Sequence, residues 1–143
     1  MTDVIGVVFP VLKWNIDRFF KDGKTVFIKP ATIYLKLKPG QKFLFYQTRE
    51  DTGYAGEAII KSITLRDDPL DFFEIFGDKI FLSKEEVKQY IQENKKWKSA
   101  KNRSFQKTKT RLWLAIELEK IKKYPRVKKI EGFVPVSGMY IKK

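Results

Sequence analysis

Short apolar segments, each bounded by turn residues, constrain what this chain can fold into more than any other feature of its sequence. The first segment, Asp3–Phe9, is rich in β-branched residues and is closed by Pro10. Lys42–Thr48 and Tyr54–Leu65 are aromatic and apolar, and a charged turn separates them. Runs of this length and composition are typical of strands, and two of them joined by a turn predict a hairpin.

Three further segments are also expected to form strands. Thr25–Lys29 is a short strand candidate, and Ile130–Tyr140 is strand-like around its glycines and prolines. In Leu112–Leu118 every second residue is Leu or Ile. A period of two places these side chains on one face, so this segment predicts a half-buried strand.

Helical spacing and capping residues predict three helices. Leu12–Phe20 has apolar residues three and four positions apart, and Leu70–Phe76 begins directly after a proline. Ser83 and Glu86 have the spacing of a capping box, and the helix that begins there is expected to end near Lys96. The buried stripe of that helix is expected to consist of Val87, Tyr90 and Ile91.

The order of these segments predicts an α+β fold. Five to six mixed strands with a few helices are typical of a small pseudo-β-barrel decorated by helices. The chain has 143 residues and shows neither internal repeats nor a boundary between domains. We therefore expect a single domain over residues 1–143, with a basic C-terminal part over 95–143.

The absence of cysteine and histidine restricts the chemistry of this chain. Disulfides, thiolate metal sites, histidine-ligated zinc and histidine acid–base catalysis are excluded. We expect no metal and no other cofactor. No apolar run reaches the roughly 20 residues that span a bilayer, and the first residues lack the features of a signal peptide. The chain is therefore expected to be cytoplasmic, without a membrane partner.

Positive charge is concentrated at one end of the chain. Residues 1–94 contain 14 basic and 14 acidic side chains, whereas residues 95–143 contain 16 basic and 3 acidic ones, which accounts for the net charge of +13. Such asymmetry indicates a polyanionic partner. The alternative is a lysine-rich solvated face, but ion-pair networks on such faces need both signs of charge.

Two clusters carry most of this charge. The first spans residues 95–111, with Trp97 and Phe105 interleaved, and its polar part, Ser99–Lys109, is expected to be an exposed loop. Cations neutralise phosphates and aromatic rings stack on unpaired bases, so this cluster predicts a nucleic-acid surface. Trp97 has an alternative role as a core anchor, seven residues after Tyr90. The basic residues of the first cluster are Lys95, Lys96, Lys98, Lys101, Arg103, Lys107, Lys109 and Arg111.

The second cluster lies around Tyr124 and Pro125 and is either a part of the same surface or a solvated hairpin turn. Trp113 lies between the clusters, on the strand face opposite Leu112 and Leu114, beside Arg111. It is either an outward stacking platform or is packed beneath a helix. The basic residues of the second cluster are Lys120, Lys122, Lys123, Arg126, Lys128 and Lys129, of which Lys122, Lys123 and Arg126 are predicted to contact nucleic acid.

Three features of the sequence carry a family resemblance. The first is the segment Asp22-Gly23-Lys24-Thr25, and the second is Lys29, five residues after Lys24. The third is the turn Lys38-Pro39-Gly40, which is followed by an aromatic strand and a charged hairpin. This arrangement resembles the PUA-like superfamily, especially its ASCH branch and the related EVE domains, over about residues 4–66. The ending 132–140 (Gly-Phe-Val-Pro-Val-Ser-Gly-Met-Tyr) is similar to an uncharacterised archaeal group within that superfamily.

The resemblance implies a PUA-like pseudo-barrel with a cleft for RNA or for a single modified nucleobase. Lys24 matches the motif lysine, and Lys29 stands where the ASCH motif usually has arginine. ASCH amidohydrolases use a threonine three residues after the lysine, where this chain has Phe27; Thr25 follows the lysine directly instead. The cleft is expected to contain Lys24, Thr25, Lys29, Tyr46, Tyr54 and Glu57.

Glu57 shares a strand face with Ile59 and Ile63 in a regular alternation. A carboxylate on the inner face of a barrel must be paired or must have a raised pKa. We therefore expect a pair of Lys24 and Glu57 in the cleft, with a structural ion pair or a glutamate exposed at the rim as the alternatives.

Three functions follow from these features. A nucleic-acid-binding module with RNA as its partner is favoured over an enzyme. A small hydrolase that acts on RNA or on a modified nucleoside is the alternative, with Lys24 and Glu57 as its working groups. The third is an adaptor whose basic face docks an acidic protein. The segment Gly23-Lys24-Thr25 is not a phosphate-binding P-loop, because it lacks the upstream glycine and leads into a strand.

Overall fold

The computed structural model describes residues 4–30, 36–48, 52–101, 112–129, 134 and 138–142, with the side chains of 93–101 and 142 left out. Its elements combine helices and strands in an α+β fold, as the sequence predicts. In chain order they are β1 (Val4–Leu12), α1 (Lys13–Phe20), β2 (Val26–Pro30), β3 (Lys42–Thr48), β4 (Gly53–Arg66), α2 (Asp71–Phe76), the 3₁₀ turn η1 (Gly77–Lys79), α3 (Lys84–Lys101), β5 (Trp113–Lys128) and β6 (Met139–Lys142).

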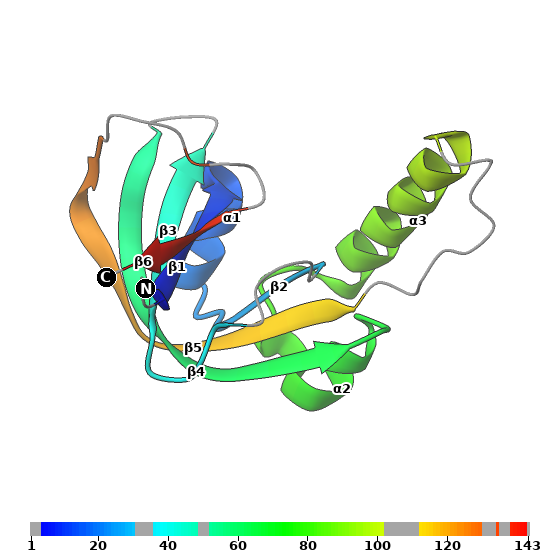
Figure 1. The fold of residues 1–143 in the computed structure, drawn as a ribbon, viewed down its shortest axis with the longest axis horizontal. Coiled ribbons are helices and arrows are strands. Elements are labelled where there is room, and N and C mark those ends of the chain that lie inside the picture. Colours follow the sequence, from blue (N-terminus) through cyan, green and yellow to red (C-terminus); the bar gives the residue numbers. More distant parts are fainter. Residues whose placement is uncertain are drawn as a thin grey trace.

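The strands form one mixed sheet in the order β2-β5-β4-β3-β1-β6. β1 pairs in parallel with β3, and every other pair among the described strands is antiparallel. β4 and β5 are the longest strands, and Figure 1 shows them running side by side and bending strongly along their length. The predicted hairpin of β3 and β4 is confirmed.

The sheet curls into a half-barrel, which confirms the expected pseudo-barrel. β1 and β2 are separated by three strands in the sheet order, yet the rings of Phe9 on β1 and Phe27 on β2 stack with centroids 5.0 Å apart. Phe43 lies 5.3 Å from Phe27, and Phe19 of α1 lies 5.1 Å from Phe45. A ladder of phenylalanines therefore fills the concave side, since each strand turns every second residue inward.

β1 is longer than its sequence suggests, because Pro10 does not end it. The strand continues to Leu12 and pairs with β3 as far as Thr48. The pairing of β1 with β6 stops at Val8, so Pro10 lies where this side of β1 is an edge among the described strands. Proline is tolerated at such positions because its missing N–H removes no ladder hydrogen bond.

The capping box at the start of α3 forms as predicted. The backbone N–H of Ser83 donates to Glu86 Oε1 at 2.8 Å, and the backbone N–H of Glu86 donates to Ser83 Oγ at 3.1 Å. Arg18 of α1 also donates to Glu86 Oε1 at 2.7 Å, and this bond together with the Ser83 N–H holds the pKa of Glu86 below its ordinary value. These bonds attach the start of α3 to α1.

Two expectations for α3 are corrected. The helix continues to Lys101 rather than ending near Lys96, so the first residues of the expected loop, 99–101, are helical. Lysine and alanine are good helix formers, and no glycine or proline stops the helix there. Tyr90 is 43% exposed although it was expected in the buried stripe with Val87, which is fully buried. The rest of the predicted loop lies outside the described residues.

β5 differs from its prediction on two counts. Trp113, Leu114 and Ala115 are all buried, so the beginning of this strand is covered on both faces rather than one, while Leu112 before it is exposed. Figure 1 shows α2 and α3 on opposite sides of this part of the sheet, and Phe72 of α2 belongs to the same hydrophobic core. The second basic cluster is not a hairpin turn either, because β5 continues through it to Lys128 in pairing with β4.

Among the described helices, none combines the length and the apolar composition needed to cross a lipid bilayer.

Candidate functional site

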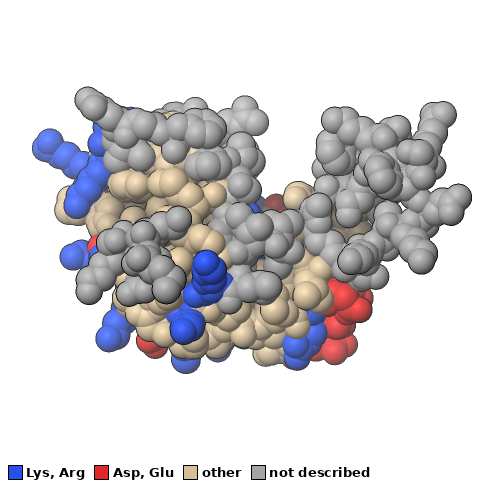
Figure 2. Space-filling model, in the orientation of Figure 1, with Lys and Arg blue, Asp and Glu red and all other residues tan. Residues whose placement is uncertain are grey.

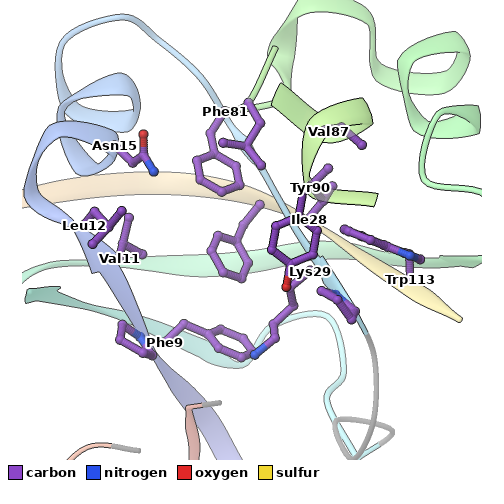
Figure 3. Close-up of a pocket in the computed structure, with 14 residues that line it drawn as sticks. Phe9, Val11, Leu12, Asn15, Ile28, Lys29, Phe81, Val87, Tyr90 and Trp113 are labelled. Atoms are coloured by element: carbon purple, nitrogen blue, oxygen red, sulfur yellow. The ribbon is translucent and has the colours of Figure 1, made fainter. Parts of the chain in front are cut away.

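A cavity of about 310 Å³ lies where the half-barrel is open, and we call it the seam cavity. Among the described strands, β2 pairs only with β5, and β1 pairs with β3 and β6, so no strand pairing joins β1 to β2. The end of β1, the first turn of α1, β2, the beginning of β5 and the start of α3 line this opening (Figure 3). Pro10 and Pro30 belong to the lining and lack the N–H groups that would invite another strand.

The walls of the seam cavity are aromatic. Phe27 and Phe81 stack with centroids 5.2 Å apart and planes at 20°. Tyr90 meets Trp113 edge to face, with centroids 5.5 Å apart and planes at 81°. Flat apolar walls of this kind accommodate a planar aromatic ligand, because ring faces and edges attract one another.

Lys29 is the charged residue of the seam cavity lining. Its Nζ lies 4.6 Å from the centroid of the Phe9 ring, within the range of a cation–π contact. Burial removes water from the ammonium group and lowers the pKa of Lys29 to about 8. Near neutral pH Lys29 therefore presents a poorly hydrated positive charge to whatever enters the cavity.

Asn15 supplies a second polar group from the first turn of α1. Figure 3 shows its amide at the α1 side of the cavity, with the nitrogen directed toward the cavity and the oxygen away from it. Asn15 Oδ1 is buried and has no hydrogen-bond partner within the part of the chain that the structure describes. The cavity thus combines aromatic walls with the side-chain nitrogens of Lys29 and Asn15.

The structure brings together only some of the residues predicted for the cleft. Lys29 and Trp113 line the seam cavity, and Trp113 is buried beneath Tyr90 of α3 rather than turned outward. Lys24 lines a different hollow between α1 and the start of α3, where its Nζ donates to the backbone carbonyl of Asp78. Thr25 is not among the residues that line the seam cavity, although its Oγ1 is buried without a partner in the described ranges.

The expected pair of Lys24 and Glu57 does not form. Glu57 accepts a hydrogen bond from Tyr124 Oη at 3.0 Å, and its Oε2 lies 3.7 Å from Lys42 Nζ. The core positions of β4 are Ala58 and Ile60, so Glu57 points to the outer face of the sheet. The two groups that a hydrolase of the predicted kind would need together therefore have separate partners.

A β-bulge in β4 explains why a regular alternation placed Glu57 on the same face as Ile63. The pairing of β4 with β5 shifts register between Glu57 and Ile59 and again between Ile60 and Ser62. At the first shift the extra residue lies on β5, so the alternation along β4 is unchanged there. At the second shift the extra residue lies on β4 and reverses its alternation once, so Ile63 and Glu57 cannot be assigned to one face by counting in twos.

Tyr46 and Tyr54, also predicted for the cleft, lie close to each other instead of lining the seam cavity. Their rings are 5.9 Å apart. Tyr124 is adjacent, and burial, followed by the hydrogen bond to Glu57 and the charges of Glu57 and Tyr54, raises the pKa of Tyr124 to about 12. This group on the outer face is a tyrosine–carboxylate network, separate from the aromatic walls of the seam cavity.

The first basic cluster lies mostly beyond what the structure describes. Lys95, Lys96, Lys98 and Lys101 belong to the last turns of α3, as does Trp97, but their side chains are not described. The remaining basic residues of this cluster lie outside the described residues: Arg103, Lys107, Lys109 and Arg111.

The second basic cluster forms a surface with residues that the charge pattern did not single out. Lys123 and Arg126 of β5 line a hollow of about 570 Å³ together with Lys13 and Lys21 of α1, and we call it the basic hollow. Its one lining carboxylate, Asp17, lies 3.6 Å from Lys21 Nζ. Figure 2 shows basic side chains projecting from the edge of the molecule that β5 forms. Lys122 is exposed on the same strand.

Sequence reasoning missed Asn15, Phe81 and Trp14. Asn15 lies three residues after Leu12 and four before Phe19, so a polar residue on the apolar face of a predicted helix was the available signal. Trp14 is 60% exposed. Phe81 lies between predicted elements and carries no local signal, because its role depends on the pairing of 80–81 with the start of β2.

The curled mixed sheet with its three helices has the PUA-like fold of ASCH proteins. The ASCH protein of Zymomonas mobilis has this fold: the structure of one of its serine-to-alanine mutants gives a TM-score of 0.72 at 14% identity, covering 99% of this chain and 91% of that one. The structure of the unsubstituted protein gives 0.69 at 16% identity, covering 96% and 87%. At these identities the likeness concerns the fold.

The chain belongs to the family described as a domain of unknown function, DUF365, which matches residues 4–143. It is also 39% identical over 102 residues to the uncharacterized protein MJECS03 of Methanocaldococcus jannaschii, covering 71% of this chain and 89% of that protein. The relative is archaeal, in keeping with the group that the C-terminal segment resembles.

Proposed function

We propose that this protein is a nucleic-acid-binding module for RNA that holds one base in the seam cavity while its basic surface contacts the phosphates. The observation that carries this proposal is the combination of aromatic walls with the partly buried cation of Lys29. A base has two aromatic faces and a polar edge, which matches such a lining. Each base stacked on an aromatic side chain contributes about 1–3 kcal/mol to binding.

The size of the seam cavity supports a single base. About 310 Å³ is at the lower end of the roughly 300–1,000 Å³ found for small-molecule sites. The ammonium group of Lys29 and the amide nitrogen of Asn15 can donate to the carbonyl oxygens or ring nitrogens on a base edge. A base can reach such a cavity only when it is unstacked, so single-stranded segments and loops are the expected ligands.

The charges outside the cavity support a polyanion. Lys13, Lys21, Lys123 and Arg126 surround the basic hollow, and the single carboxylate there is already paired. The sequence of the first basic cluster adds eight further cations with no acid among them. Binding of cations to phosphates releases counterions, which makes affinity dependent on salt.

The test is fluorescence anisotropy of labelled single-stranded RNA, single-stranded DNA and duplex DNA at several salt concentrations. We expect single-stranded RNA to bind most tightly. Each phosphate contributes a slope of about −0.7 to the logarithm of affinity against the logarithm of salt, so four contacts give about −3. No binding of any of these nucleic acids at low salt would refute the proposal.

Lys29→Met tests whether the seam cavity takes part. This variant should weaken binding of single-stranded RNA by about tenfold while leaving the salt slope nearly unchanged, because Lys29 is not part of the phosphate surface. Lys61→Met is the matched control: it removes the same charge from an exposed lysine of β4 that is 4.0 Å from Glu117. Equal effects of the two variants would remove the cavity from the proposal.

A further inference from the structure

Trp14 is an exposed tryptophan with nothing in the described structure to account for its position. Its exposed fraction is 60%, whereas Ile16 and Phe19 of the same helix are 1% and 3% exposed. Within the described ranges it takes part in no aromatic or cation–π contact. The exposed indole offers a flat aromatic face on which a base can stack.

Trp14 lies on α1 between the seam cavity and the basic hollow. Successive residues of a helix are about 100° apart. Asn15 on one side of Trp14 lines the seam cavity, and Asp17 and Lys21 on the other side line the basic hollow. Trp14 therefore lies on the ridge between the seam cavity and the basic hollow. This ridge is the helix α1 itself, which is roughly 10 Å wide, and about three stacked nucleotides of a single strand span that distance.

We propose that Trp14 is a second base-stacking platform, over which a single strand passes from the seam cavity to the basic hollow. This inference rests on the proposed function and gives the bound strand a path. One base occupies the seam cavity, a neighbouring base stacks on the exposed indole, and the following phosphates lie against Lys13, Lys21, Lys123 and Arg126.

Charge complementarity selects a single-stranded nucleic acid as the occupant of this path. The basic hollow has four cations and one paired carboxylate, which fits phosphates and disfavours a second copy of this basic chain. An indole stacks on any base with little sequence preference, whereas a double helix hides its base faces. The path therefore adds affinity without adding sequence specificity.

The experiment compares a mononucleotide, which can fill only the seam cavity, with an oligonucleotide long enough to cross α1. A labelled mononucleotide and a six-residue single-stranded RNA are titrated against the wild type, Trp14→Ala and Trp14→Phe. We expect Trp14→Ala to weaken binding of the hexamer by roughly 5- to 100-fold, the range of one lost base stack, and to leave the mononucleotide unchanged. Trp14→Phe should restore much of the loss.

Ile75→Ala is the matched control, because Ile75 is 48% exposed on α2, which does not line the path. Binding of the hexamer should also quench tryptophan emission in the wild type. The part of this quenching that comes from Trp14 should disappear in Trp14→Phe, whereas the part that comes from Trp113 in the seam cavity should remain. Since Trp14 is exposed, both Trp14 variants are expected to unfold at the temperature of the wild type, which circular dichroism measures.

The outcomes separate this inference from the function on which it rests. If Trp14→Ala binds the hexamer as tightly as the wild type while Lys29→Met weakens it, the path is refuted and the proposed function stands. If the wild type binds neither RNA, both fail. If the wild type self-associates and Trp14→Ala is monomeric, the indole docks a second copy and the path is refuted.

Discussion

Lys29 is positively charged and partly buried, so a rise in pH is expected to change folding stability and ligand binding in opposite directions. Its pKa is about 8 in the folded protein, against 10.5 in a solvated chain, because burial disfavours the charged form. Between these values the unfolded chain binds more protons than the folded one, so the free energy of unfolding rises with pH. A ligand held by the ammonium group loses that contact over the same interval.

We therefore predict that stability and binding respond oppositely to pH. From pH 7 to pH 9.5 the midpoint of chemical unfolding should rise, while the affinity for a labelled mononucleotide should fall as Lys29 loses its proton. Lys29→Met should flatten both curves. Urea titrations followed by circular dichroism and anisotropy at matched pH values measure the two quantities, and a parallel rise of both would contradict the assignment.

At the scale of single elements, local chemistry sets where the helices and strands begin. Ser83 and Glu86 start α3, and Gly77, with a φ of 62°, ends α2 in a conformation that glycine adopts readily. The start of α3 also bears on the site, since Val87 and Tyr90 line the seam cavity one and two turns further on. A weakened cap should therefore affect both stability and ligand binding.

Ser83→Ala is expected to lower the free energy of unfolding by about 1 kcal/mol, within the roughly 0.5–2 kcal/mol found for lost N-caps. Thermal or urea unfolding followed by circular dichroism measures this change. Lys88→Ala, at an exposed position of the same helix, should stay within about 0.5 kcal/mol of the wild type. A loss no larger in Ser83→Ala than in Lys88→Ala would mean that the capping box contributes nothing to stability.

At the scale of the whole molecule, folding joins charges that are distant in the sequence. The first 94 residues are neutral in sum, yet Lys13 and Lys21 from that part complete the basic hollow with Lys123 and Arg126. The charge pattern alone pointed only to the C-terminal third. The tertiary structure extends the candidate surface to α1, next to the seam cavity.

The extended surface can be tested by removing two positive charges from α1. Lys13→Gln and Lys21→Gln together should reduce the salt slope for single-stranded RNA by about 1.4, at ~0.7 for each lost phosphate contact. The pair Lys36→Gln and Lys38→Gln removes equal charge from exposed positions that line neither the seam cavity nor the basic hollow. Equal changes of slope in both double variants would indicate that net charge, rather than this surface, determines binding.

The sequence by itself determined the α+β class, the β3–β4 hairpin and the three helices, because caps, turns and periodicity depend on residues that are close in the chain. It also singled out Lys29 and Trp113, two residues that line the seam cavity. Only the tertiary structure decided which faces are buried: a bulge in β4 separates the face of Glu57 from that of Ile63, and Tyr90 of α3 packs against the buried Trp113. The seam cavity exists because a curled sheet brings β1 against β2 without pairing these two described strands. That contact joins segments far apart in the sheet, and no local pattern encodes it.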